Sequence, residues 1–204
     1  MRLALTAALA LGLAACSNAA LPASAKAAPI ERPEAAAHEE IAIFAGGCFW
    51  CIEAELEEVP GVRTVLSGYT GGTTPDPTYR NMGDHAEAVE VIYDPAKVSY
   101  DQLLEVFWSN IDPTDEGGQF FDRGSQYRTA IFVLDEAQEA AAKQSLEANA
   151  KRLKQPIVTA VLPATAFYPA EEYHQDYYLK EPERYEAYKK GSQREETLKK
   201  VWQE

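Results

Sequence analysis

The sequence is poor in the residues that hold metal ions. It contains three cysteines and three histidines among 204 residues, and no cysteine follows Cys51. A structural zinc site normally needs a second pair of ligands at a similar spacing, and His38, His85 and His174 are too scattered to supply one. We therefore expect no metal and no other cofactor in this chain.

Basic charge and long apolar runs are also scarce. The chain has 19 Lys and Arg against 32 Asp and Glu, a formal net charge of -13 at pH 7. This balance argues against a nucleic-acid partner, because no basic patch is available to meet phosphates. It also gives the protein no electrostatic attraction to anionic lipid. The apolar run from Leu3 to Leu13 is too short to span a membrane.

That N-terminal run instead resembles the start of a secretion signal. Leu13-Ala14-Ala15-Cys16 resembles a bacterial lipobox, in which the cysteine becomes the lipidated first residue. We expect a signal peptide over residues 1–15 and an exported protein. A lipid on Cys16 would anchor it to a bacterial membrane, with the protein on the periplasmic side. The alternative is an ordinary signal cleaved after small residues. Residues 16–38, rich in Ala and Pro, predict a flexible tether before a domain at 39–204.

Two of the three cysteines stand in Gly46-Gly47-Cys48-Phe49-Trp50-Cys51, between a predicted strand at 41–45 and a predicted helix at 49–58. The start of a helix favours a thiolate at Cys48, and Cys51 lies one turn further on, within reach of its sulfur. A bridge between them would close almost no loop, so it would stabilise little. A catalytic pair explains this placement better than a structural disulfide or two small core residues.

Hydrophobic periodicity predicts the remaining elements of the domain. Further strands are expected at 62–68, 86–93, 128–134 and 157–162. Helices are expected from Ser99, which can cap the first turn, and at 135–154 and 171–178, with a solvated helical tail after Pro182. This order favours an α+β two-layer sandwich that has a mixed sheet and a split β-α-β, ferredoxin-like core.

One carboxyl group stands in an apolar pattern. Glu87, Val89 and Val91 alternate along the strand at 86–93 and so share one face. If that face is interior, burial would push Glu87 toward its neutral form, which could donate a proton. The alternative, an acidic residue at a strand end that faces water, fits the pattern equally well.

The tetrapeptide Gly47-Cys48-Phe49-Trp50 resembles the signature of A-type peptide methionine sulfoxide reductases. Other segments resemble that family in the same order between about Ile41 and Lys180: Gly68–Gly72, Pro77–Tyr79, His85–Val89, Asp112–Thr114, Asp122–Arg128 and Tyr173–Gln175. The resemblance implies an enzyme that reduces the S epimer of methionine sulfoxide, free or protein-bound, to methionine. Its role would be protein repair after oxidative damage. The family fold is also α+β.

The resemblance also implies roles for individual residues. Cys48 would attack the sulfoxide sulfur and become a sulfenic acid, while Glu87 protonates the oxygen. Tyr79 and Tyr127 would hold that oxygen, and Asp122 would help to orient the site. Reduction of a sulfoxide needs both a nucleophile at sulfur and a proton donor at oxygen, so this set of groups suits the chemistry.

The two aromatic residues next to Cys48 suit the other part of the substrate. A methyl group and a polarizable sulfur pack well on aromatic rings, so Phe49 and Trp50 are expected to wall a methyl pocket. Many family members have Gly or Ser in place of Cys51 and recycle through a C-terminal cysteine, which this chain lacks. Cys51 is therefore expected to form a disulfide with Cys48, which a thioredoxin-like dithiol protein then reduces. Asp84, where many members have Gly, is a second departure.

Two other functions fit parts of the sequence. A Cys-x-x-Cys pair after a strand is also found in thioredoxin-like disulfide oxidoreductases, which would not need Glu87. A lipid-anchored binding module would use the cysteine pair only for structure. His85 and His174 are expected to be structural hydrogen-bonding residues.

Overall fold

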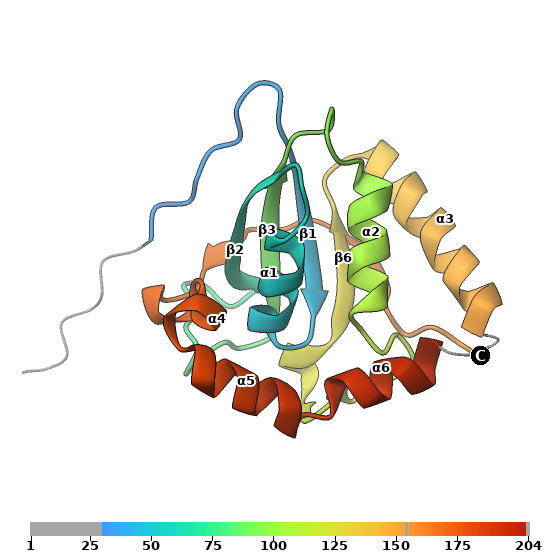
Figure 1. The fold of residues 1–204 in the computed structure, drawn as a ribbon. Coiled ribbons are helices and arrows are strands. Elements are labelled where there is room, and N and C mark those ends of the chain that lie inside the picture. The colour runs from blue at the N-terminus through green and yellow to red at the C-terminus, as the bar shows by residue number, and fades with distance from the viewer. Residues whose placement is uncertain (1–29, 154, 203–204) are drawn as a thin grey trace, which may run out of the picture.

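The computed structural model describes residues 30–153 and 155–202 (Figure 1). The predicted signal peptide, Cys16 and most of the predicted tether lie outside the described residues. Within the described part of the chain, every helix is too short or too polar to cross a membrane.

A ferredoxin-like core forms the centre of the fold. Strands β1 and β2 flank β3, and helix α1 connects them, which gives one split β-α-β unit. Strands β3 and β6 flank β1 in the same way, with α2 in their connection. The predicted split core is therefore confirmed. Its elements are β1 (Glu40–Gly46), α1 (Phe49–Glu57), β2 (Val62–Thr70), β3 (Ala86–Tyr93), α2 (Tyr100–Ser109) and β6 (Thr129–Val133).

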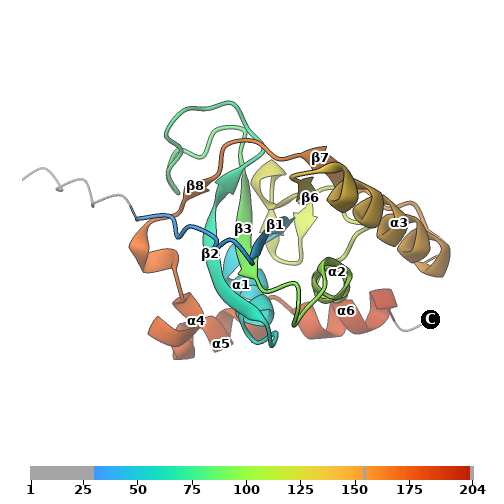
Figure 2. The ribbon, with the colours of Figure 1, turned by 90° about the horizontal axis from the view of Figure 1, so that it is seen from above.

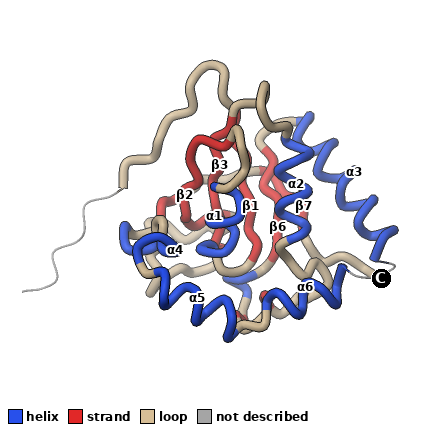
Figure 3. Tube along the Cα trace, in the orientation of Figure 1, coloured by secondary structure: helices blue, strands red, loops and turns tan. Residues whose placement is uncertain are grey.

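Two edge strands complete the sheet, whose order is β7-β6-β1-β3-β2-β8. Because β7 pairs with β6 in parallel while the other pairs are antiparallel, the sheet is mixed, as predicted. Figure 3 shows the helices that follow the core. The edge strands and outer helices are β7 (Ala160–Pro163), β8 (Tyr168–Pro169), α3 (Glu136–Leu153), α4 (Tyr177–Lys180), α5 (Pro182–Gly191) and α6 (Arg194–Trp202).

The segment predicted as a polar loop, residues 112–126, contains short elements that the sequence pattern does not reveal. Strands β4 (Gly118–Gln119) and β5 (Asp122–Arg123) form a small hairpin, and a 3₁₀ turn follows at Ser125–Tyr127. Predicted helix 171–178 is likewise broken, into a 3₁₀ turn at Glu172–His174 and α4.

Helix α2 shows how local sequence sets an element. The Ser99 hydroxyl accepts the Gln102 amide at 3.2 Å, and the Gln102 side chain accepts the Ser99 amide at 2.9 Å. This capping box satisfies two backbone donors that a helix start otherwise leaves free. The predicted cap at Ser99 is confirmed, and Phe107 on the buried face stacks on Phe44 with ring centroids 5.1 Å apart.

Both faces of the central sheet are covered. Helices α1 and α2 lie on the same side as α4 to α6, and the segment that connects β7 to β8 crosses the other side (Figure 2). Strand β3 is consequently buried along its whole length. Since its side chains alternate, Glu87 faces the helices with Val89 and Val91, whereas Glu90 faces the opposite side.

Glu90 forms an ion pair with Arg32, which lies in the segment that the sequence predicted to be a flexible tether. The Arg32 guanidinium donates to both carboxylate oxygens of Glu90, with Nε at 2.7 Å from Oε1, and lies 5.7 Å from the Phe167 ring centroid. Ile30 packs on the apolar cluster of the same face. We call residues 30–38 the strap. It neutralises a carboxylate that is otherwise fully buried.

We expect Arg32→Ala to lower the free energy of unfolding by about 2 kcal/mol, because it leaves the buried Glu90 charge without its partner. The loss should be smaller than for a fully buried pair, since the Arg32 side chain is 44% exposed. Urea denaturation would measure it. Lys143→Ala, which breaks the exposed pair with Glu139, is the control and should cost about 0.5 kcal/mol or less. Equal effects of the two variants would contradict the role of the strap.

Candidate active site

A tight glycine turn places Cys48 at the start of α1. Gly47 has φ +82°, and a Cβ atom built on it would lie 2.5 Å from Cβ of Gln119. A Cβ on Gly46 would lie 2.7 Å from Cδ1 of Ile52. Neither position has room for a side chain, and Gly47 also needs a left-handed backbone. Cys48 is the N-cap residue of α1, so the predicted strand-to-helix junction is confirmed.

Both cysteines of the pair are free thiols and are buried, with 5% of Cys48 and 1% of Cys51 exposed. They pack together with Ala54 and with Tyr185 of α5. Burial raises the pKa of Cys48 well above its ordinary value, and the nearby Cys51 and Glu87 raise it further. The predicted preference for a thiolate at Cys48 is therefore wrong for the reduced, substrate-free protein.

The acidic member of the pair is Cys51. Its pKa is lowered to about 7, chiefly through its interaction with the Cys48 thiol and, despite burial, with help from the positive charge of Arg194. Two thiols this close titrate as one unit, so the first proton leaves easily and the second with difficulty. At neutral pH the pair carries one negative charge in part of the molecules, and that charge is centred on Cys51.

Glu87 lies beside this pair. It is 1% exposed and accepts the backbone N–H of Phe49, the first residue of α1, at 3.1 Å. Burial raises its pKa to about 8, and the negative charges of Asp122 and Cys51 add to the effect, although the Phe49 amide opposes it. The interior alternative for Glu87 is thus confirmed and the water-facing one is wrong. Glu87 is a neutral acid at pH 7 that can donate a proton.

The remaining polar residues predicted for the site gather around Glu87. Burial raises the pKa of Tyr127 and of Tyr79, and the charge of Glu87 is the next cause for both hydroxyls. Asp122 also acts on both, and its own carboxyl accepts a hydrogen bond from Tyr188. Tyr79 is 39% exposed, which leaves this side of the site open to solvent.

Aromatic rings form a second side of the site. Phe49 is buried, and its ring centroid lies 6.2 Å from that of Trp50, which stacks on Tyr177 at 3.9 Å. The Trp50 indole donates to Nδ1 of His174 at 3.2 Å, and the His174 ring lies 4.4 Å from Tyr79. Burial lowers the pKa of His174 to about 4, so this residue is a neutral hydrogen-bonding partner, as the sequence predicted.

His85 is also a structural residue, because Gly72 donates to its Nδ1 at 3.2 Å and its Nε2 lies 2.8 Å from the Thr74 carbonyl. Asp84 serves the same loop. Its carboxylate accepts the amides and hydroxyls of Thr73 and Thr74 at 2.8 to 3.0 Å, and these bonds lower its pKa. Asp84 therefore holds the loop that contains Thr73 and Thr74.

Sequence reasoning missed several residues near the cysteines. The tail after Pro182 was predicted to be solvated, but Tyr185 and Arg194 are buried, and α5 places Tyr185 and Tyr188 at the cysteine pair. Two tyrosines three residues apart on a charged helix were the available signal for this buried face.

Sequence reasoning also missed Glu53. It is fully buried on α1, and its carboxylate oxygens have no hydrogen-bond partner among the residues that the structure describes.

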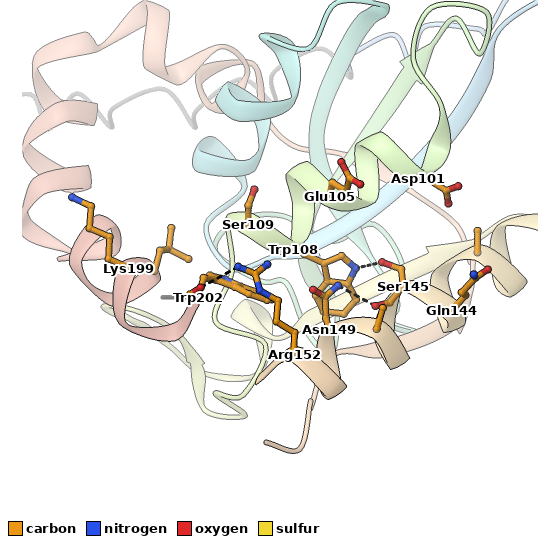
Figure 4. A pocket seen from close by; sticks show the side chains of 13 residues that line it. Asp101, Glu105, Trp108, Ser109, Gln144, Ser145, Asn149, Arg152, Lys199 and Trp202 are labelled. Carbon is orange, nitrogen blue, oxygen red and sulfur yellow. Dashed lines mark hydrogen bonds between the residues drawn. The ribbon is translucent and has the colours of Figure 1, made fainter. Parts of the chain in front are cut away.

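Two features elsewhere in the described chain bear on other possible functions. Among residues 30–153 and 155–202, no three His, Cys, Asp or Glu side chains gather as they would to bind a metal ion. A cavity of about 920 Å³ lies between α2, α3 and α6, and its lining includes Trp108, Arg152 and Trp202 (Figure 4). It contains none of the site residues that the sequence predicted.

Comparison with known proteins agrees with this arrangement. The family model described as peptide methionine sulfoxide reductase matches residues 40–204. The chain belongs to that family. A reductase of the family from Bacillus licheniformis is 51% identical over 169 residues, which cover 80% of this chain and 93% of the relative. One from Caulobacter vibrioides is 51% identical over 173 residues, covering 82% and 88%.

Solved structures of peptide methionine sulfoxide reductases share the fold. Methionine sulfoxide reductase A of Corynebacterium diphtheriae superposes with a TM-score of 0.69 at 36% identity, over 72% of this chain and 77% of that one. Reduced Mxr1 from Saccharomyces cerevisiae gives the same TM-score at 28% identity, over 72% and 87%. The α+β fold and the identity as a reductase of this family therefore rest on both sequence and structure.

The buried carboxyl groups predict how stability depends on pH. Burial raises the pKa of Glu53 from 4.5 to about 8, as it does for Glu87. Between these values the folded state holds a proton that the unfolded state has lost. The contribution to stability is therefore complete below pH 4.5 and is lost as pH rises through 8. We expect the free energy of unfolding to fall from pH 5 to pH 8, with roughly 3 kcal/mol from each group.

Glu53→Gln should remove part of this slope, and the double variant with Glu87→Gln should remove more. Urea unfolding at several pH values between 5 and 8 would measure it. Glu58→Gln, at the exposed end of α1, is the control and should keep the wild-type slope. A slope unchanged by Glu53→Gln would show that this carboxyl does not carry the proton.

Proposed function

We propose that this reductase converts the S epimer of methionine sulfoxide, free or in oxidised proteins, to methionine, with Cys48 as nucleophile, Glu87 as proton donor and Cys51 as resolving thiol. The observation that carries the proposal is the neutral, buried Glu87 carboxyl, held at 3.1 Å by the amide next to Cys48. A nucleophile and an acid thus face one small volume, as sulfoxide reduction requires.

In the first step, the sulfur of Cys48 attacks the sulfoxide sulfur while Glu87 donates its proton to the oxygen. The attack forms a bond between the two sulfur atoms. The S–O bond of the substrate then breaks and the protonated oxygen passes as hydroxyl to the Cys48 sulfur, while the S–S bond breaks and its electron pair leaves with methionine. Cys48 is left as a sulfenic acid. The proton that Cys48 gives up replaces the one that Glu87 donates, so the step consumes no net proton. A pKa of about 8 keeps Glu87 protonated at neutral pH.

The tyrosines and aromatic rings supply binding. The hydroxyls of Tyr79 and Tyr127 lie near Glu87 and would donate hydrogen bonds to the sulfoxide oxygen as negative charge develops there. The Phe49 and Trp50 rings would take the methyl group, and the hydrogen bond from Trp50 to His174 fixes the indole. Asp122 is held by Tyr188 and would orient the polar side of the substrate.

Cys51 completes the cycle. It packs with Cys48 inside the same apolar cluster, so its thiolate can displace hydroxide from the sulfenic acid and form a disulfide. A thioredoxin-like dithiol protein would then reduce that disulfide. Yeast Mxr1 has been crystallised in complex with Trx2, which supports a reductant of this class.

A thioredoxin-like disulfide oxidoreductase is the second candidate, because it too uses a Cys-x-x-Cys pair. Disulfide exchange has a sulfur leaving group and therefore needs no acid to protonate a departing oxygen. The placement of Glu87 therefore favours sulfoxide reduction.

We further propose that the enzyme is exported and lipid-anchored through Cys16 on the periplasmic side of a bacterial membrane. The lipobox-like Leu13-Ala14-Ala15-Cys16 and the apolar run before it support this location. Cys16 would then be blocked by lipid, which leaves Cys51 as the internal thiol that resolves Cys48.

A single-turnover experiment tests the catalytic roles. Pre-reduced protein mixed with excess methionine sulfoxide, without reductant, should release about one methionine per enzyme and form a Cys48–Cys51 disulfide. Cys51→Ser should release the same amount but lose at least about tenfold in steady-state turnover with a protein dithiol donor. Methionine quantitation and mass mapping of the disulfide would measure this. Turnover of Cys51→Ser at the wild-type rate would remove Cys51 from the cycle.

Two further variants are the controls for this experiment. Cys48→Ser should release no methionine. Glu87→Gln should slow methionine release by about 10² to 10⁴, the usual worth of a positioned proton donor, while its reduced cysteine pair still exchanges with a small disulfide. Absence of methionine from folded wild-type protein, with rapid exchange on protein disulfides, would instead support the oxidoreductase.

The anchor predicts a fractionation result. Full-length protein expressed in a Gram-negative host should sediment with membranes and incorporate labelled fatty acid, whereas Cys16→Ser should do neither. Ser17→Ala, beside the modified residue, is the control and should behave as wild type. A wild-type protein that stays in the soluble fraction without label would disprove lipidation.

A further inference from the structure

Arg194, the first residue of α6, is a buried cation that forms no ion pair with any described residue. It is 2% exposed, and one guanidinium nitrogen donates to the backbone carbonyl of Asn110. Its guanidinium carbon lies 4.6 Å from the Phe120 ring centroid. Among residues 30–153 and 155–202, Nε and Nη1 have no hydrogen-bond partner. Within the described chain, Arg194 takes part in no ion pair.

The two contacts of Arg194 connect it to the turn that carries Cys48. Asn110 precedes Ile111, whose side chain packs against Gly46, and Phe120 follows Gln119, whose side chain packs against Gly47. Arg194 therefore holds both segments that support the glycine turn. A fully desolvated guanidinium at this position is costly unless a negative charge is present nearby for part of the reaction cycle.

The negative charges near Arg194 belong to the active site. Its positive charge lowers the pKa of both Cys51 and Asp122. Asp122 already accepts a hydrogen bond from Tyr188, whereas Cys51 packs in an apolar cluster with Cys48, Ala54 and Tyr185. The titratable and charged groups around the Cys51 sulfur come from several elements, namely Cys48, Glu87, Tyr185, Tyr188, Lys189 and Arg194.

We infer that Arg194 is a positioning residue for the second step of the reaction, in which it holds Cys51 as a thiolate for attack on the Cys48 sulfenic acid. The inference rests on the proposed function. In this step the Cys51 sulfur forms a bond to the Cys48 sulfur, the S–O bond of the sulfenic acid breaks, and the oxygen leaves as hydroxide, which takes a proton to become water. The electrons balance, since one sulfenic acid and one thiolate give one disulfide.

Lys189 is the natural comparison, because it is the other cation that acts on Cys51. Its ammonium group is paired with Glu55 at 3.3 Å, and 26% of its side chain is exposed. Water and the carboxylate therefore screen its charge, whereas the charge of Arg194 is screened by neither. We therefore expect Arg194 to lower the pKa of Cys51 more than Lys189 does.

The test uses the full chain carrying Arg194→Met, which keeps the side-chain length and removes the charge. In single turnovers, methionine release reports the first step and disappearance of a dimedone-reactive sulfenic acid reports the second. Relative to methionine release, disulfide formation at pH 7 should slow about tenfold, as a pKa increase of about one unit in Cys51 implies. The defect should disappear by about pH 9.5, where Cys51 ionises without help. Lys189→Met should change the ratio less than twofold.

Arg194→Lys keeps the charge and should keep the pH profile of the wild type. Equal slowing of both steps at every pH would reduce Arg194 to a structural support and overturn the inference, as would a wild-type ratio in Arg194→Met. Absence of methionine from the wild-type enzyme would instead mean that the proposed function itself fails.

A second measurement covers the case in which Arg194→Met does not fold. In Cys48→Ser, whose hydroxyl can still donate a hydrogen bond, the thiolate absorbance of Cys51 at about 240 nm can be titrated directly. An apparent pKa below about 8.5, the ordinary value for cysteine, supports a cationic partner, and a value at or above it overturns the inference.

Discussion

The hydrogen bond from the Phe49 amide to the Glu87 carboxyl is the contact on which the active site depends. It joins the first turn of α1 to the middle of the sheet and so fixes the distance between nucleophile and acid. It also offsets part of the cost of burying a carboxyl group, which allows Glu87 to stay inside as a neutral acid. Three features bring the Cys48 thiol next to the Glu87 carboxyl: the glycine turn, the N-cap position of Cys48 and the face of β3 that points toward the helices.

Much of this arrangement was predictable from local patterns. Strand β3 occupies residues 86–93 as predicted, because alternation and β-branched residues indicate a strand. Burial of both its faces was not predicted, since the pattern left the environment of Glu87 open. The two glycines before Cys48 indicated a tight turn, and the packing of Gln119 against Gly47 gives the reason. Tyr79 and Tyr127 were different. Periodicity did not distinguish them among 11 tyrosines, so only the family resemblance singled them out.

What the sequence could not show depends on packing between distant segments. The helix start predicted a thiolate at Cys48, but burial of the sulfur and capture of the Phe49 amide by Glu87 outweigh the helix dipole. The charged tail looked solvated because its composition is polar, although the fold turns one face of it toward the cysteines. Burial of a charged residue such as Arg194 by distant segments cannot be predicted from the composition of its own segment.

The strap has a consequence for where the enzyme can work. Since Arg32 is fixed to Glu90 on the face of the sheet opposite α1, only the roughly 16 residues between Cys16 and Arg32 can separate the folded domain from a lipid at Cys16. A fully extended chain of that length spans on the order of 55 Å. An enzyme anchored at Cys16 would therefore reach substrates only within this distance of the bilayer. Oxidised proteins in or next to the membrane would then be reduced in preference to substrates in the bulk of the compartment.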